Sequence, residues 1–168
     1  MNTVPEKHRA AAGRASLACA VLTCSDTRTP ENDTSGALMC ELLEAAGHRV
    51  ELYEIVREHP GQVHEAIGRA STTCAVILLN GGTGISRRDG TIEAVRQFIE
   101  RELPGFGELF RMLSYQEIGA AAMLSRALAG TREHVAVFAT PGSTPAVRLA
   151  VEQLIIPELR HLSALLVT

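Results

Sequence analysis

The chain has 168 residues, of which 46% are hydrophobic and 21% charged. This is the length of one ordinary domain and the composition of a globular protein, which excludes disordered and fibrous chains. A formal net charge of -3 excludes the general electrostatic attraction that holds proteins on nucleic acid or on anionic membranes. We therefore expect neither partner, and any phosphate must be bound by local loop geometry.

No apolar run approaches the ~18 residues of a bilayer-spanning helix, and the N-terminal stretch lacks the apolar core of a signal peptide. We expect a flexible tail over residues 1–15 and a single domain over residues 16–168 in a cytoplasmic protein. Neither CxxC nor HExxH spacing occurs, so buried free thiols are favoured over a protein-ligated metal. The cysteines concerned are Cys19, Cys24, Cys40 and Cys74.

The first half of the chain predicts strand, helix, strand, helix. Leu17–Cys24 is almost wholly apolar, as in a buried strand. Apolar residues at helical spacing run from residue 34 or 35 to Ala46, and Gly47 ends that helix. Val50–Val56 then predicts a strand, and Pro60 opens the next helix.

The second half begins with another apolar strand, Cys74–Leu79. Thr91 is predicted to cap a helix that the sequence LPGFG (residues 103–107) ends. A further helical stretch is expected from Glu108, with a kink or a second helix near Gly119.

The last predicted elements are a buried strand, Val135–Ala139, and a helix capped by Ser143 or Thr144 with Pro145 at its first position. Strands that are apolar on both faces and alternate with amphipathic helices are typical of a parallel sheet covered on both sides. The fold class predicted from these patterns is α/β.

In open α/β sheets, ligands bind where strand carboxyl ends meet helix starts, so the loops after the buried strands are the candidate sites. The middle loop, NGGTGISRRDGT, has glycine at 81, 82 and 84, and glycine lets backbone amides approach an anion closely. It matches neither GxxxxGK[ST] nor GxGxxG, because Arg87 stands where the third glycine belongs. A tight turn that needs positive φ explains the same glycines equally well.

Asp89 makes the phosphate interpretation stronger. A helix start favours an anion by only ~0.3 to 1 kcal/mol, too little to neutralise a polyphosphate. Mg²⁺ is typically held by one or two carboxylates together with substrate phosphates, which is a role Asp89 can fill. The alternative is a first-turn carboxylate that complements the helix dipole. Arg87 and Arg88 either pair with phosphate oxygens or are solvated.

The other loops leave similar alternatives. Residues 25–27 offer hydroxyl donors and a carboxylate, or form an Asx turn. Residues 140–143 present amide groups at a helix start, for binding or for capping. Glu58 and Glu108 are candidate acids, with surface solvation as the simpler explanation for both.

Three strings occur together and in order: GGTGISRRDGTIEAV (Gly81–Val95), the run from PGFGE to LSRALAG (Pro104–Gly130), and PGSTPAV (Pro141–Val147). In this combination the chain resembles the MogA/MoaB family of molybdenum cofactor biosynthesis proteins, from about residue 17 to residue 166. The closing PELRHL (Pro157–Leu162) is more similar to the MoaB branch.

The resemblance implies a three-layer α/β/α sandwich with a mostly parallel, mixed sheet, whose antiparallel strand lies around Arg126–Gly130. It implies a homotrimer or homohexamer, with molybdopterin and ATP as partners and other cofactor biosynthesis proteins as candidates. Active members carry out Mg²⁺-dependent adenylylation, in which the terminal phosphate of the pterin attacks the α-phosphate of ATP and pyrophosphate leaves.

Carried onto this sequence, the family pattern implies that Asp89 is catalytic. It also implies that Asp89 binds Mg²⁺ together with the substrate phosphates. The pattern also implies a set of substrate-binding residues drawn from all three loops and from the long helical run. These residues are Ser25, Asp26, Gly81, Gly82, Thr83, Gly84, Ser114, Ser125, Pro141, Gly142 and Ser143.

One position departs from the pattern. Where the family commonly has Pro-Asp before a helix, this chain has Arg57-Glu58, and Glu58 is the second catalytic candidate. The extra methylene moves the carboxylate by about an ångström, and misplacement of that order can cost ~100-fold in rate. Two functions therefore stay open: an adenylyltransferase, and a non-catalytic paralogue that binds or carries molybdopterin. A general nucleotide-binding module is disfavoured because both usual phosphate motifs are absent.

Overall fold

The computed structural model describes residues 15–167, so the predicted tail, apart from Ala15, lies outside the described residues. Its sheet has six strands in the order β2-β1-β3-β6-β5-β4. The strands are β1 (Ala18–Cys24), β2 (Arg49–Val56), β3 (Val76–Asn80), β4 (Arg101–Glu102), β5 (Leu128–Arg132) and β6 (Val135–Thr140). The α-helices are α2 (Thr34–Ala45), α3 (Pro60–Ala70), α4 (Thr91–Phe98), α5 (Pro104–Ile118), α6 (Thr144–Ala150) and α7 (Ile156–Leu166).

The sheet is mixed. Strands β2, β1, β3 and β6 are parallel, β5 pairs antiparallel with β6, and β4 pairs antiparallel with β5. The antiparallel strand expected around residues 126–130 is therefore β5. The short strand β4 was not predicted, because its two exposed residues carry no apolar pattern.

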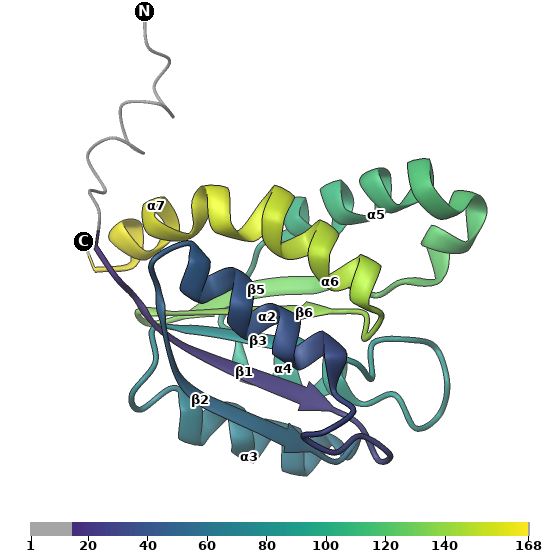
Figure 1. Cartoon of the computed structure of the whole chain (residues 1–168), viewed down its shortest axis with the longest axis horizontal. Coiled ribbons are helices and arrows are strands. Elements are labelled where there is room, and N and C mark those ends of the chain that lie inside the picture. Colours follow the sequence, from purple (N-terminus) through teal and green to yellow (C-terminus); the bar gives the residue numbers. More distant parts are fainter. Residues whose placement is uncertain (1–14, 168) are drawn as a thin grey trace, which may run out of the picture.

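Helices cover both faces of the sheet. Figure 1 shows α2, α5, α6 and α7 along one face and α3 and α4 along the other. Each face has its own buried cluster: Val21 and Leu78 face the first group of helices, and Leu22 and Ile77 face the second. This explains why the central strands are apolar on both faces, and it confirms the three-layer α/β/α sandwich. Among the helices within residues 15–167, none has both the length and the apolar character to cross a bilayer.

Helix boundaries follow backbone chemistry. The carboxylate of Asp33 caps α2 by accepting from the amide of Gly36, and Gly47 ends it with φ of +85°. Pro60 opens α3 as predicted. The predicted cap at Thr91 is wrong, because Gly90 is the N-cap and the buried Thr91 hydroxyl makes no capping hydrogen bond.

The region around LPGFG also differs from the prediction. Helix α5 begins at Pro104 and not at Glu108, since proline fits the first helical turn. Gly107 inside it is required by packing, because a Cβ there would lie 2.6 Å from the carbonyl oxygen of Ala127. The break near Gly119 is confirmed: φ is +62° there, and a 3₁₀ helix, η1 (Gly119–Leu124), follows.

The single last helix of the prediction is interrupted. A π-helical turn, η2 (Val151–Ile155), separates α6 from α7. Pro157 has no amide hydrogen to donate to the carbonyl of Gln153, so the regular α-helical bond cannot form at this point.

Candidate functional site

Three central strands end in a row of buried polar side chains. Thr23, Asn80 and Thr140 are register partners on β1, β3 and β6. The Asn80 amide donates to the Thr23 hydroxyl at 2.9 Å. The Thr140 hydroxyl donates to the carbonyl of Leu79 at 3.2 Å. These bonds fix the strand ends, so the three loops that leave them start side by side at the carboxyl edge of the sheet.

The loop after β3 opens with a turn that only glycine fits well. Gly81 and Gly82 have φ of +87° and +61°, in the left-handed region. A Cβ on Gly81 would lie 2.3 Å from the Cys24 carbonyl oxygen, and one on Gly82 would lie 2.4 Å from the Thr91 hydroxyl. The steric explanation of these glycines is therefore correct, and the same turn brings the backbone into the site.

The loop after β6 packs directly on that turn. A Cβ on Gly142 would lie 3.1 Å from the Cα of Gly81. The Gly142 carbonyl accepts a 2.8 Å hydrogen bond from the Ser35 hydroxyl. The Ser143 hydroxyl accepts from the amide of Ala146 and so caps α6. The capping alternative for this loop is present, and it leaves the loop in place beside the glycines.

A hollow of about 320 Å³ lies between these two loops, α5 and η1. Most of the sequence-predicted site residues line it. They are Gly82, Thr83, Gly84, Asp89, Ser114, Ser125, Pro141, Gly142 and Ser143. The opposite wall is apolar and comes from Phe110, Ile118, Ala122, Leu124 and Ala146. Residues far apart in the sequence are thus brought together.

The remaining predicted residues lie around this hollow without lining it. Gly81 shapes the turn beneath it. Ser25 and Asp26 line a neighbouring hollow of about 670 Å³ beside β2. The Ser25 hydroxyl accepts from the amides of Thr27 and Arg28, both at 3.2 Å. The turn is therefore made by the Ser25 hydroxyl and is not the expected Asx turn, because the Asp26 carboxylate accepts from the amide of Glu58 instead.

Several backbone amides of the loop after β3 are left without a hydrogen-bond acceptor within the described residues. No acceptor among residues 15–167 is found for the amides of Gly82, Thr83, Gly84 and Ile85, and residues 82 and 83 are buried. A buried amide without a partner costs free energy comparable to a lost hydrogen bond, so native structures rarely leave several together. Successive inward amides form an anion-binding concavity. The glycine turn is therefore suited to phosphate oxygens.

Asp89 lies beside these amides. Its Oδ2 accepts a 2.7 Å hydrogen bond from the amide of Ser86. A Cβ on Gly84 would lie 2.8 Å from the same oxygen. For Oδ1 the described residues supply no donor. One carboxylate oxygen thus shapes the loop while the other remains available.

The carboxylates of Asp26, Glu58 and Asp89 lie near one another around the glycine turn. The pKa of Glu58 is raised, first by partial burial and then by the negative charges of Asp26 and Asp89. The positive charge of Arg88 opposes this shift. Asp26 also accepts from the backbone amide of Glu58 at 3.2 Å. Within residues 15–167, no three such side chains are arranged to hold a metal by themselves.

Other candidate side chains stay apart from the main hollow. Glu108 is exposed on α5, and Arg87 lines a separate hollow behind the glycine loop. Of the four free cysteines, three are buried and Cys40 is half-buried. Burial raises the pKa of Cys24 to about 12, so this thiol is not a nucleophile at neutral pH.

The sequence prediction missed Arg126. Its Nε donates to the carbonyl of Gly84 at 2.7 Å, and its Nη2 donates to the carbonyl of Asp89 at 3.3 Å. Its guanidinium also pairs with Glu93 on α4. The LSR string that supports the family resemblance contains this residue. No local spacing reveals its role, because its partners lie more than thirty positions earlier in the chain.

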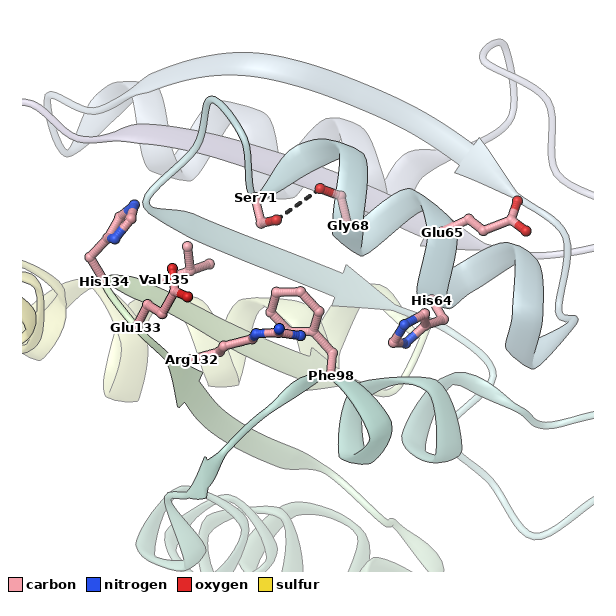
Figure 2. A pocket seen from close by; sticks show the side chains of 9 residues that line it. All are labelled: His64, Glu65, Gly68, Ser71, Phe98, Arg132, Glu133, His134 and Val135. Atoms are coloured by element: carbon pink, nitrogen blue, oxygen red, sulfur yellow. Dashed lines mark hydrogen bonds between the residues drawn. The ribbon is translucent and has the colours of Figure 1, made fainter.

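A second hollow, of about 330 Å³, lies at the opposite edge of the sheet, between α3, the end of α4 and the β5–β6 turn. Figure 2 shows Arg132 over the ring of Phe98, with His64 at the other side of that ring. The guanidinium carbon of Arg132 is 5.2 Å from the ring centroid, and its Nε is 3.6 Å from a carboxylate oxygen of Glu100. None of the predicted site residues lines this hollow.

Known proteins are similar to this chain over most of its length. Residues 20–161 match the model of a protein family described as a probable molybdopterin binding domain. Molybdenum cofactor biosynthesis protein B of Halalkalibacterium halodurans is 55% identical over 161 residues, which cover 93% of each chain. A crystal structure of molybdenum cofactor biosynthesis protein B has a TM-score of 0.89 and 50% identity, over 92% of this chain and 98% of that one. The tungsten cofactor synthesizing protein MoaB from Pyrococcus furiosus has a TM-score of 0.78 and 38% identity, over 87% of this chain and 94% of that one.

Proposed function

The chain belongs to the molybdopterin-binding domain family, on its MoaB branch, and we propose that it binds molybdopterin and transfers adenylate to it from MgATP. A role in molybdenum cofactor biosynthesis follows from the family membership. The proposed adenylyl transfer is supported by the backbone amides of the glycine loop that have no acceptor among residues 15–167.

The phosphate groups of the two substrates meet at the glycine turn. The amides of Gly82, Thr83 and Gly84, which have no acceptor within the described part of the chain, supply donors in a partly buried place. There each hydrogen bond to a charged oxygen is stronger than in water. The chemistry needs positioning and charge neutralisation more than a nucleophilic side chain. Burial raises the pKa of the Cys24 thiol, which therefore stays protonated and does not act as a nucleophile.

Asp89 is the residue that would hold Mg²⁺. The ion, when bound, neutralises charge on the polyphosphate and on the departing pyrophosphate. Its fit is supported by the unused Oδ1 of Asp89 and by the raised pKa of Glu58, since clustered carboxylates repel each other without a cation. Glu58 is the second candidate acid at this place.

The two sides of the turn suit the two substrates. The main hollow combines an apolar wall containing Phe110 with the hydroxyl groups of Ser114 and Ser125, which suits a flat, polar-edged pterin. Across the turn, Ser25 and Asp26 border the larger hollow, which has room for a nucleotide. The pterin phosphate oxygen forms a bond to the α-phosphorus of ATP. The bond to the bridging oxygen breaks, and pyrophosphate leaves with that electron pair.

A carrier without catalysis is the second candidate function, and Arg57-Glu58 in place of the family's Pro-Asp favours it. The two are separated by incubating the pure protein with molybdopterin, ATP and Mg²⁺ and measuring pyrophosphate and adenylylated pterin. Formation of both supports the transferase. Bound pterin with no product would leave the carrier, and no binding of either substrate would remove both.

We also propose that the chain assembles as a homotrimer or homohexamer. Helix α5 exposes Leu109, Met112 and Tyr115, which have 47%, 53% and 63% of their surface accessible. A neighbouring row of exposed apolar side chains on one helix is typical of an interface. Light scattering on the pure protein measures the assembly, and a monomer at micromolar concentration would contradict this proposal.

A further inference from the structure

We propose that Arg126 is a positioning residue, which sets the direction of the amides in the glycine loop from the side opposite the substrate. The ligand part of this inference rests on the proposed function, whereas the loop geometry does not. Arg126 borders the hollow behind the loop, together with Pro60 and Arg87, and does not line the main hollow. It therefore acts on the substrate only through the backbone.

The guanidinium binds two carbonyls of the loop. Nε donates to the oxygen of Gly84 at 2.7 Å and Nη2 donates to the oxygen of Asp89 at 3.3 Å. In a trans peptide the C=O and N–H bonds lie in one plane and point in opposite directions. The amides of Ile85 and Gly90, which belong to these two peptide units, must therefore point away from Arg126. Neither amide has an acceptor among residues 15–167.

The guanidinium is itself held by α4. Glu93, in the first turn of that helix, accepts from Nη1 and, at 3.3 Å, from Nη2. The Glu93–Arg126 pair lowers the pKa of Glu93. Since Arg126 lies just before β5, one planar group connects the sheet, the loop and the helix. A lysine has no planar fork and cannot bind both carbonyls and the carboxylate in this way.

A purely structural ion pair would behave differently. The side chains of Arg126 and Glu93 are 32% and 52% accessible, and pairs exposed to this extent contribute little to stability. Loss of the two carbonyl bonds should instead loosen the loop and leave the three-layer core intact. Removal of the Arg126 guanidinium should therefore affect the loop locally far more than it affects global unfolding.

The test compares Arg126→Gln with Arg132→Gln. The control is also an arginine paired with a glutamate, but it lies at the opposite edge of the sheet. Amide hydrogen exchange in residues 84–90 is measured by NMR without ligand, at the amides of Ser86, Arg88 and Asp89, which are hydrogen-bonded within the loop. MgATP binding is measured by calorimetry. In Arg126→Gln we expect exchange at least ~10-fold faster and affinity ~10-fold lower, as for lost charge-assisted bonds. Arg132→Gln should change neither.

Two further variants sharpen the result. Arg126→Lys should recover little of the slow exchange, whereas ethylguanidinium added to Arg126→Ala should recover part of it. Unchanged exchange at residues 84–90 in Arg126→Gln overturns the inference, whatever the protein binds. If the wild type binds neither MgATP nor molybdopterin, the proposed function fails while the exchange result still decides the role of Arg126.

Discussion

The two edges of the sheet carry hollows of almost equal size, about 320 and 330 Å³, and they differ in which polar groups line them. At the carboxyl edge, the amides of Gly82, Thr83 and Gly84 have no acceptor among residues 15–167, and Asp89 lies beside Gly84. At the amino edge, Arg132 is stacked on Phe98 and paired with Glu100. Size therefore does not identify a site. Backbone amides without an acceptor distinguish the candidate site, and they lie at the edge where open α/β sheets bind ligands.

The largest expected effect is that of Asp89→Asn. The asparagine oxygen can still accept from the amide of Ser86, so the loop should keep its turn. Loss of the negative charge should reduce adenylyl transfer at least ~10²-fold, as for a major electrostatic contributor. Steady-state kinetics measures the turnover of the variant, and thermal unfolding measures its stability. Glu65→Gln, which alters an acid lining the amino-edge hollow, is the control. Equal turnover in Asp89→Asn and wild type would remove Asp89 from the site.

The next effect is expected at Gly82. Alanine there must adopt φ of +61° and meet the Thr91 hydroxyl at 2.4 Å, so we expect a loss of about 2 kcal/mol in unfolding free energy. MgATP affinity should fall as well, because the amides move. Gly68→Ala changes a glycine of α3 that lines the other hollow and has open space around it.

Gly68→Ala should raise the unfolding free energy by about 0.5–1 kcal/mol through helix propensity. Substrate affinity should stay unchanged. Chemical denaturation and calorimetry of both variants give the comparison. Similar losses of affinity at the two glycines would mean that the carboxyl edge has no special role.

A smaller effect is expected for Arg132→Ala. An exposed cation–π contact and one ion pair at 3.6 Å should together contribute at most about 1 kcal/mol to stability. Activity should be unchanged. Denaturation curves and turnover measure the two quantities, and a fall in turnover with preserved stability would show that the amino edge takes part in function.

The smallest effect is expected for Glu58→Gln, and it depends on pH. The pKa of Glu58 is raised above 4.5 in the folded protein by burial, Asp26 and Asp89. Its charged form therefore costs stability at neutral pH, and this cost disappears as the pH falls through the folded pKa. The variant should unfold at a slightly higher temperature than wild type at pH 7, and the difference should vanish below 4.5.

Mg²⁺ with ATP is the control for this prediction. A bound cation offsets the carboxylate repulsion, so it should reduce the advantage of Glu58→Gln. Calorimetric scans across pH, with and without MgATP, give the measurement. A variant that is less stable than wild type at pH 7 would contradict the assigned direction.

The sequence could predict most of the fold because the decisive signals are local. Three apolar runs predict the central strands β1, β3 and β6, and Pro60 and Gly47 mark helix boundaries through their own backbone preferences. Errors arose where distant contacts decide. Gly107 is tolerated in a helix because the Ala127 carbonyl approaches it closely. Thr91 is turned inward because its amide binds the Gly82 carbonyl.

The site was predicted in a similar way. The glycines and Asp89 occur in one short string, and the family resemblance added Ser114 and Ser125, which helices bring to the same hollow. Arg126 was missed because its action on the loop depends on a pairing 42 positions away in the chain. The contact of Ser25 and Asp26 with a substrate remains a prediction. The Ser25 hydroxyl accepts within its own turn, and Asp26 accepts from the distant amide of Glu58.

The contact between Gly81 and Gly142 has a mechanical consequence. Backbone already stands within 3.1 Å of the position that a side-chain carbon on Gly142 would take, and the Ser35 hydroxyl holds the Gly142 carbonyl from the other side. An inward shift of the loop after β6 must therefore push the loop after β3 with it. A ligand that displaces one of the two loops therefore also displaces the other. Binding at one wall of the main hollow changes the shape of the opposite wall.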